Sequence, residues 1–134
     1  MMLRRLTPLV LVACVTSSTI TYLPSPEQPP LALDEGRAMI ARFIGPECDR
    51  LVAANLASRQ VDVVVATDSA GLARSAELRG STGDERANGV IGAVAAQLDL
   101  GSNAATASGT GGSAALRAGY SCADGGVTAS LEHR

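Results

Sequence analysis

The chain has 134 residues, a formal net charge of −2, and three aromatic residues with no Trp among them. This length gives room for one domain, whose core has to be built from Val, Leu, Ile and Ala. A core this small stabilises weakly, so a covalent cross-link would help the chain to fold. All eleven basic residues are Arg, and they form no basic stripe. Nucleic acid is therefore not an expected partner, because phosphate contacts need clustered positive charge.

The first residues have the layout of an export signal. Arg4 and Arg5 form a positively charged start, and residues 6–12 are almost wholly apolar. The order Leu11-Val12-Ala13-Cys14 follows, and it resembles the bacterial lipobox, in which a small residue precedes an invariant Cys. The resemblance implies that diacylglycerol is attached to Cys14 and that the chain is cut just before it. Residues 1–13 are then a signal peptide.

Two other interpretations of this segment stay open. Cleavage could fall among residues 17–19, although no Ala-x-Ala site is present there. An uncleaved membrane helix would need about 20 mostly apolar residues, and the polar residues 16–19 interrupt the run. Because Val15 rather than Asp follows Cys14, the sorting pattern of enteric lipoproteins favours the outer membrane. We expect an exported, periplasm-facing protein of the bacterial envelope, held to membrane lipid through an acylated Cys14.

The remaining cysteines are Cys48 and Cys122. Two thiols in an oxidising compartment favour one disulfide, and two buried free thiols are the alternative. The bridge would close a loop of about 74 residues, which contributes about 4 kcal/mol in the chain-entropy account. These two Cys and the lone His133 do not make a zinc set. We therefore expect no metal and no other cofactor.

The mature chain is expected to begin with a tether and a helical region. Residues 14–33 are assigned to a lipidated tether, because the segment is rich in Ser and Thr and then in Pro. The domain is expected over residues 34–134. Asp34 is the predicted N-cap of a first helix, which breaks at Gly45-Pro46. A second helical piece is predicted from Glu47 to Ser58, with Cys48 near its apolar stripe.

The middle of the chain predicts a β-hairpin followed by a helix. β-Branched residues fill the strand Val61–Thr67, and Asp68–Gly71 forms a turn before the returning strand Leu72–Arg79. Thr82 and Glu85 have capping-box spacing, which begins a helix that runs to about Leu98 or Leu100.

The last third of the chain predicts a loop and further strands. Residues 101–113 are rich in Gly and Ser without periodicity, which indicates a flexible loop. Ala114–Cys122 and Val127–Glu132 are a final hairpin candidate. The predicted fold class is α+β: a small two-layer domain in the order helix, β-hairpin, helix, terminal strands, with an antiparallel sheet and helices on one face.

Five short segments carry a family resemblance over about residues 34–100. They are Val61-Asp-Val-Val-Val, Asp68-Ser-Ala-Gly71-Leu72, Ala76-Glu-Leu78, Ser81-Thr-Gly83-Asp84 and Val94-Ala-Ala-Gln-Leu98. This pattern resembles the TonB C-terminal-like domain, and Cys48 in the first helix resembles stand-alone, myxobacterial-type members. The resemblance implies binding of an extended peptide along an exposed sheet edge, by β-augmentation.

The chain also departs from TonB itself. TonB has an uncleaved inner-membrane helix and a long Pro-rich spacer, whereas residues 15–30 would extend only about 50 Å. The aromatic-rich last strand of the family is replaced here by the loop at 101–113 and by Tyr120-Ser-Cys122. An energy transducer is therefore not expected.

The expected function is that of a membrane-anchored envelope lipoprotein with a small binding module for an extended peptide or an envelope protein. The predicted partner-binding edge is formed by Arg117, Ala118, Gly119, Tyr120 and Ser121. A structural envelope lipoprotein without a dedicated ligand and a minor envelope enzyme are the alternatives.

No catalytic group of residues can be recognised in the sequence. His133 is next to the last residue, and nothing places it near Ser75 or Ser81. Asp84 and Glu85 suit the first turn of a helix, where the helix dipole stabilises acids, so a capping role is expected for them. Arg37, Arg42 and Arg50 suit a solvated helix face. We therefore do not expect an enzyme.

Overall fold

The computed structural model describes residues 19–101, 112–123 and 126–134. The predicted signal peptide 1–13, the predicted lipidation site Cys14 and residues 102–111 of the predicted loop lie outside the described residues. The helices are α2 (Leu33–Ile44), the short 3-10 turn η2 (Gly45–Glu47), α3 (Cys48–Ala53) and α4 (Glu85–Ala95). The strands are β1 (Thr21–Tyr22), β2 (Ser58–Thr67), β3 (Ala73–Arg79), β4 (Gly112–Ala123) and β5 (Gly126–His133).

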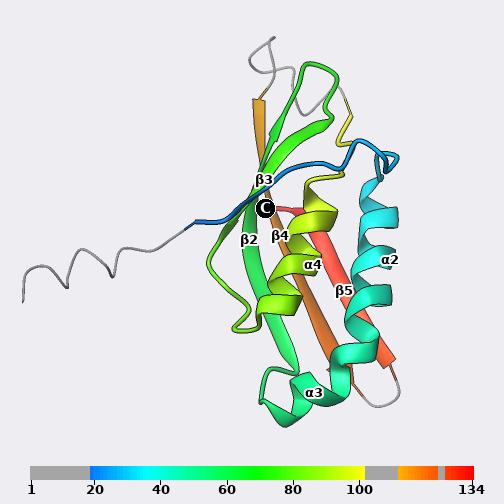
Figure 1. The fold of residues 1–134 in the computed structure, drawn as a ribbon, viewed down its shortest axis with the longest axis vertical. Coiled ribbons are helices and arrows are strands. Elements are labelled where there is room, and N and C mark those ends of the chain that lie inside the picture. Colours follow the sequence, from blue (N-terminus) through cyan, green and yellow to red (C-terminus); the bar gives the residue numbers. More distant parts are fainter. Residues whose placement is uncertain (1–18, 102–111, 124–125) are drawn as a thin grey trace, which may run out of the picture.

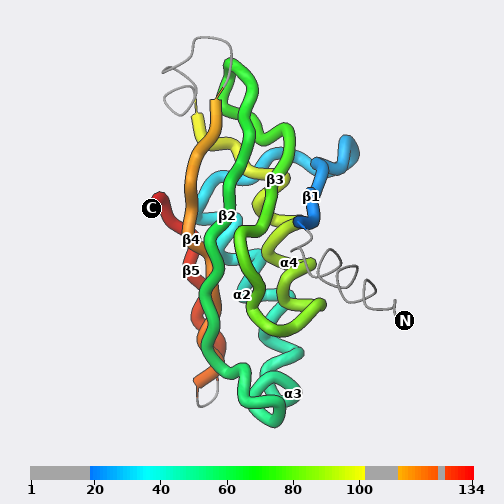
Figure 2. Tube along the Cα trace, turned by 90° about the vertical axis from the view of Figure 1, so that its left-hand side faces the viewer, coloured from blue at the N-terminus to red at the C-terminus, as the bar shows by residue number. Residues whose placement is uncertain are grey.

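The strands form one antiparallel sheet in the order β1-β3-β2-β4-β5. Helices α2 and α4 pack on one face of this sheet (Figure 1), and the view turned by 90° shows the two layers (Figure 2). The predicted α+β class, with a central hairpin and helices on one face, is therefore confirmed.

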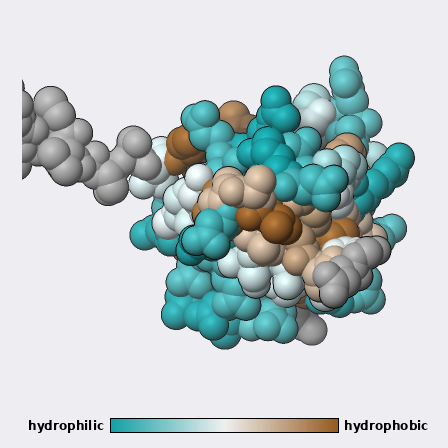
Figure 3. Space-filling model, turned by 90° about the horizontal axis from the view of Figure 1, so that it is seen from below, coloured by the Kyte–Doolittle hydropathy of each residue, from teal (hydrophilic) through white to brown (hydrophobic). Residues whose placement is uncertain are grey.

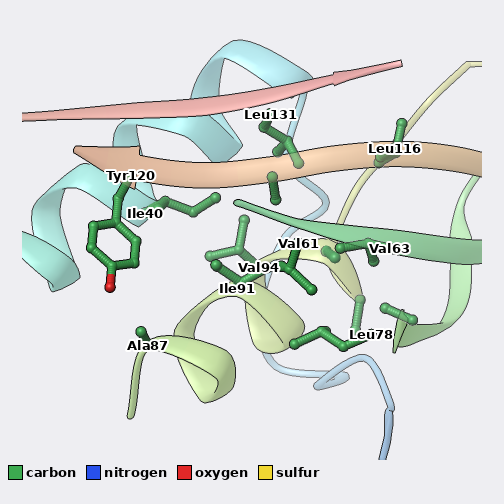
Figure 4. Packing of buried hydrophobic residues seen from close by; sticks show 14 of the residues in the cluster. Ile40, Val61, Val63, Leu78, Ala87, Ile91, Val94, Leu116, Tyr120 and Leu131 are labelled. Carbon is green, nitrogen blue, oxygen red and sulfur yellow. The ribbon is translucent and has the colours of Figure 1, made fainter. Parts of the chain in front are cut away.

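The core lies between the helices and the sheet. Alternate residues of β2 point into it, because side chains of a strand alternate between its two faces. Val61, Val63 and Val65 are buried, as are Ile91 and Val94 of α4. Figure 4 shows the α4 side chains pointing at Val61, Val63 and Leu78, with Ile40 of α2 and Leu131 of β5 closing the far side. The core thus consists mainly of aliphatic residues, as the composition requires.

The helix boundaries differ from the predicted ones. At α2 the N-cap is Ala32, not Asp34, because Glu35 reaches back and its Oε1 accepts from the Ala32 N–H at 2.9 Å. The second helical piece ends at Ala53 rather than at Ser58. Asn55 has a φ of 65°, which ends the helical path, and Ser58 already pairs with β4.

The predicted start and end of α4 are also wrong. Asp84 is its N-cap and accepts from the Ala87 N–H at 3.0 Å, while the Thr82 hydroxyl bonds Asn88 Oδ1 at 2.7 Å. Thr82 therefore organises the preceding loop instead of capping the helix. The helix stops at Ala95, short of Leu98, whose backbone pairs with residues far away in the sequence.

The predicted tether is wrong from Thr21 onward. Residues 21–31, which we call the strap, lie against the domain and begin with strand β1. The predicted loop is also shorter at its C-terminal end, because β4 starts at Gly112. The domain therefore extends from the strap to the end of β5.

Candidate functional site

The described residues offer three features for function: a cross-linked end around α3, an apolar groove beneath the strap, and the two edges of the sheet. At the α3 end, Cys48 and Cys122 form a disulfide with their Cα atoms 5.6 Å apart. The bond joins the start of α3 to the C-terminal end of β4, and it agrees with the predicted pairing. It fixes the helical region to the sheet across 74 residues of sequence.

A group of charged side chains joins α3 to the start of α4. The Arg50 guanidinium donates to both carboxylate oxygens of Asp84, at 2.6 and 3.0 Å, and to Glu47 at 2.8 Å. Arg86 reaches the same Glu47 oxygen at 3.3 Å. Such two-pronged pairing is the strongest geometry for an Arg and a carboxylate. The sequence indicated a solvated helix residue, but Arg50 links α3 to the start of α4 through Asp84.

The pKa values follow from this pairing. The hydrogen bond from Arg50 lowers the pKa of Asp84 to about 2 from its usual 3.8, with a smaller effect from the Ala87 N–H. The same guanidinium lowers the pKa of Glu47, and Asp84 raises the pKa of Arg50. All three groups are consequently charged near neutral pH. The predicted capping role of Asp84 is confirmed, and the residue also anchors α3.

Tyr120 links the same end to the core. Its side chain is buried, and its hydroxyl donates to the carbonyl oxygen of Leu56 at 2.8 Å. Burial raises the pKa of this phenol. Figure 4 shows the ring below β4 with its oxygen pointing away from the strand. The geometry gives Tyr120 a structural role and no access to a partner.

The predicted partner-binding edge is wrong, because β4 is an inner strand. Residues Arg117 to Ser121 pair with β2 on one side and with β5 on the other. Their backbone groups are thus already used within the sheet. Gly119 also lies so close to β2 that a Cβ there would stand 2.5 Å from the Arg59 carbonyl oxygen. None of this stretch is open to strand addition.

The edges of the described sheet are β1 with β3 on one side and β5 on the other. Directly after β5, the N–H of Arg134 donates to the Ala115 carbonyl at 3.0 Å. The backbone N–H and C=O groups of the even-numbered residues of β5 therefore point toward β4. The backbone groups of successive residues in an antiparallel strand point to alternate sides, so those of Val127, Ala129 and Leu131 point outward, away from β4. Arg37 occupies one of these groups, donating to the Leu131 carbonyl at 2.7 Å.

The strap is held by packing and by a few hydrogen bonds. Its β1 residues pair with Glu77 and Ala76 of β3. The Tyr22 ring lies over Gly92 of α4, where an added Cβ would stand 2.2 Å from the ring. At the far end, the Leu31 N–H donates to the Gln97 carbonyl at 2.8 Å, and the Ser25 N–H donates to Oε1 of Gln97.

An apolar groove of about 550 Å³ lies between the strap, α2 and α4. Its apolar lining includes Leu23, Met39, Phe43, Val90 and Val94. Polar groups are confined to a minority of its lining residues, among them Gln28, Glu47, Arg86 and Gln97. Sequence reasoning missed this groove because it depends on the strap. Tyr22 in the predicted tether and Gly92 inside the predicted helix were sequence features that could have indicated this contact.

The remaining predicted residues are not brought together. His133 is exposed on β5, Ser75 lies on β3, and the Ser81 hydroxyl is bonded to the Gly83 N–H and the Asn88 amide. Over the described ranges, no three His, Cys, Asp or Glu side chains gather as metal ligands would. Among those same residues, no helix has the length and apolarity to cross a membrane.

Comparisons with protein-family models, with curated protein sequences and with solved structures each find no match to this chain. The function is therefore argued below from the sequence motifs and from the geometry of this domain.

Proposed function

We propose that the chain is a lipid-anchored envelope protein whose small α+β domain binds an extended peptide or an envelope protein. Three features of the sequence support the anchor: a charged start, a short apolar run and the lipobox-like Leu11-Val12-Ala13-Cys14. The disulfide between Cys48 and Cys122 is in keeping with an oxidising compartment. We place the protein in the periplasm-facing envelope, on the outer membrane in preference to the inner one.

The single observation that carries the binding proposal is the outer edge of β5. This strand has eight residues, and within the described chain it pairs on one side only, with β4. Outward backbone groups of an edge strand pair readily with a strand of another chain. Only the Leu131 carbonyl is bonded by Arg37, so the region around Val127 and Ala129 is the part that we propose receives a partner.

The order of elements agrees with the proposed likeness to the TonB C-terminal domain. A helical region, a hairpin, a second helix and terminal strands follow one another as that resemblance implies. The likeness remains a proposal that rests on this order and on the five short segments named above. The proposal assigns the domain a binding role and no catalytic one.

Photo-crosslinking in cells tests the binding proposal. A photoreactive residue replaces Thr128, which is exposed on β5, and a second variant carries it at Ala115, exposed on β4. We expect a defined crosslinked band from position 128 and none from position 115. Pro at Ala129 should abolish this band, because Pro lacks the outward N–H and is tolerated on edge strands.

The matched control is Ala129→Ser, which keeps the backbone donor and should keep the band. An equal band from positions 115 and 128 would count against an edge-specific site. A band that survives Ala129→Pro would show that the partner does not add a strand. A crosslink to a second copy of the chain would favour the structural alternative, an oligomeric lipoprotein without a separate ligand.

A further inference from the structure

The strap shortens the segment that can separate the domain from its proposed lipid anchor. Thr21 is already paired with β3, and the strap stays in contact with the domain as far as Leu31. Only residues 15–20, six in number, separate Cys14 from Thr21. Seven steps of at most about 3.6 Å span about 25 Å. A domain tied to a lipid at Cys14 is therefore kept next to the bilayer surface.

The surface nearest to this connection is apolar. Ile20 and Leu23 are 60% and 72% exposed, and they flank β1, where the described chain begins. Phe43 of α2 is 49% exposed and lines the groove together with Leu23. Figure 3 shows apolar colour next to the start of the described chain, and a separate apolar patch at the α3 end. Exposed apolar side chains that gather on one face mark an interaction surface.

The open face of the sheet, which the helices do not cover, carries ion pairs. Asp62 of β2 pairs with Arg117 at 3.4 Å and with Arg134 at 3.2 Å, and Glu77 of β3 pairs with Arg79 at 2.7 Å. These are solvated ion pairs, which lose their hydration if they enter a membrane. The open face of the sheet is therefore suited to water.

We propose that the face formed by Ile20, Leu23 and Phe43 rests on the lipid bilayer, with its apolar side chains at the boundary between headgroups and acyl chains. This inference rests on the proposed anchor at Cys14, because the short connection is what selects the membrane as the occupant. Arg42 and Arg86 stand beside the same face, where they meet anionic headgroups. The domain then presents its charged sheet face, and the β5 edge, to the periplasm.

Tryptophan fluorescence tests the orientation, since the chain contains no Trp. The lipidated mature chain is inserted into phosphatidylethanolamine and phosphatidylglycerol vesicles whose acyl chains are brominated. The reporters are Leu23→Trp and Phe43→Trp, and the matched control is Ala115→Trp on the charged face. We expect both reporters to shift to the blue and lose most of their emission, and the control to keep the emission that it has in unbrominated vesicles.

Intact mass of the same samples separates the two proposals. An acylated chain with an unquenched Trp at position 43 overturns the docking and leaves the anchor standing. An unacylated chain overturns the anchor, and quenching in that sample still supports docking by the apolar face alone. An unacylated and unquenched chain overturns both. A blue shift that needs no vesicles and grows with protein concentration shows that a second copy covers this face, which also overturns the docking.

Discussion

The α3 end of the domain and the strap are attached to the same sheet by different means. At the α3 end, a disulfide, a two-pronged ion pair and the Tyr120 hydrogen bond act together. The strap has two paired residues, one aromatic ring over a glycine and a few exposed hydrogen bonds. One end of this domain is therefore fixed covalently, whereas the other depends mainly on packing.

Removal of the disulfide should have the largest effect. The double variant Cys48→Ser and Cys122→Ser should lose about 4 kcal/mol of free energy of unfolding, because its unfolded chain gains the entropy of an open loop. Urea denaturation measures the loss. Cys14→Ser, which keeps the bridge, is the control. A double variant as stable as this control would mean that the α3 end does not depend on its cross-link.

Gly92→Ala should loosen the contact between the strap and α4. Because a Cβ there would meet the Tyr22 ring at 2.2 Å, the ring has to move, at a cost of about 1–3 kcal/mol. Hydrogen exchange should show faster exchange in residues 21–31. Gly89→Ala is the matched control, since nothing lies within 4 Å of its Cβ position, and it should gain about 0.5–1 kcal/mol from helix propensity. Equal effects of the two substitutions would refute the strap contact.

The sequence predicted those parts of the fold that depend on local patterns. Alternating β-branched residues around Val63 gave the hairpin, and apolar spacing around Ile91 gave α4. The strap was missed because Tyr22 and Gly92 are 70 residues apart, and a Pro-rich segment without periodicity resembles a free linker. The place of β4 was missed because inner and edge strands of this small sheet have similar residue patterns. Only the pairing of Ala118 with both neighbours settles its position.

The polar link at the α3 end should weaken in acid. Asp84 has a folded pKa of about 2 against a usual 3.8, so it stabilises the fold fully above about pH 4. This stabilisation, about 1–2 kcal/mol after allowance for the half-exposed Arg50, is lost as the pH falls from about 4 to 2. Thermal unfolding against pH measures it. Asp84→Asn keeps a capping oxygen but no charge, and it should flatten the profile; an unchanged profile would exclude Asp84 as the source.

The smallest effect is expected at the strap's polar contacts. Gln97→Ala removes the acceptor of the Ser25 N–H and the donor to the Gln28 carbonyl, both exposed. The free energy of unfolding should fall by about 0.5 kcal/mol, since water replaces these partners. Urea denaturation with hydrogen exchange at residues 25–28 checks both the size and the place of the change. A loss as large as that of Gly92→Ala would show that hydrogen bonds, rather than packing, hold the strap.

Intact mass of the protein extracted from membranes tests the central claim, lipid attachment at Cys14, most directly. The account predicts a chain that begins at Cys14, carries the added mass of a diacylglycerol group, and lacks two hydrogens because Cys48 and Cys122 are bonded. A chain that still begins at Met1, or one cut among residues 17–19 without added acyl mass, would contradict it.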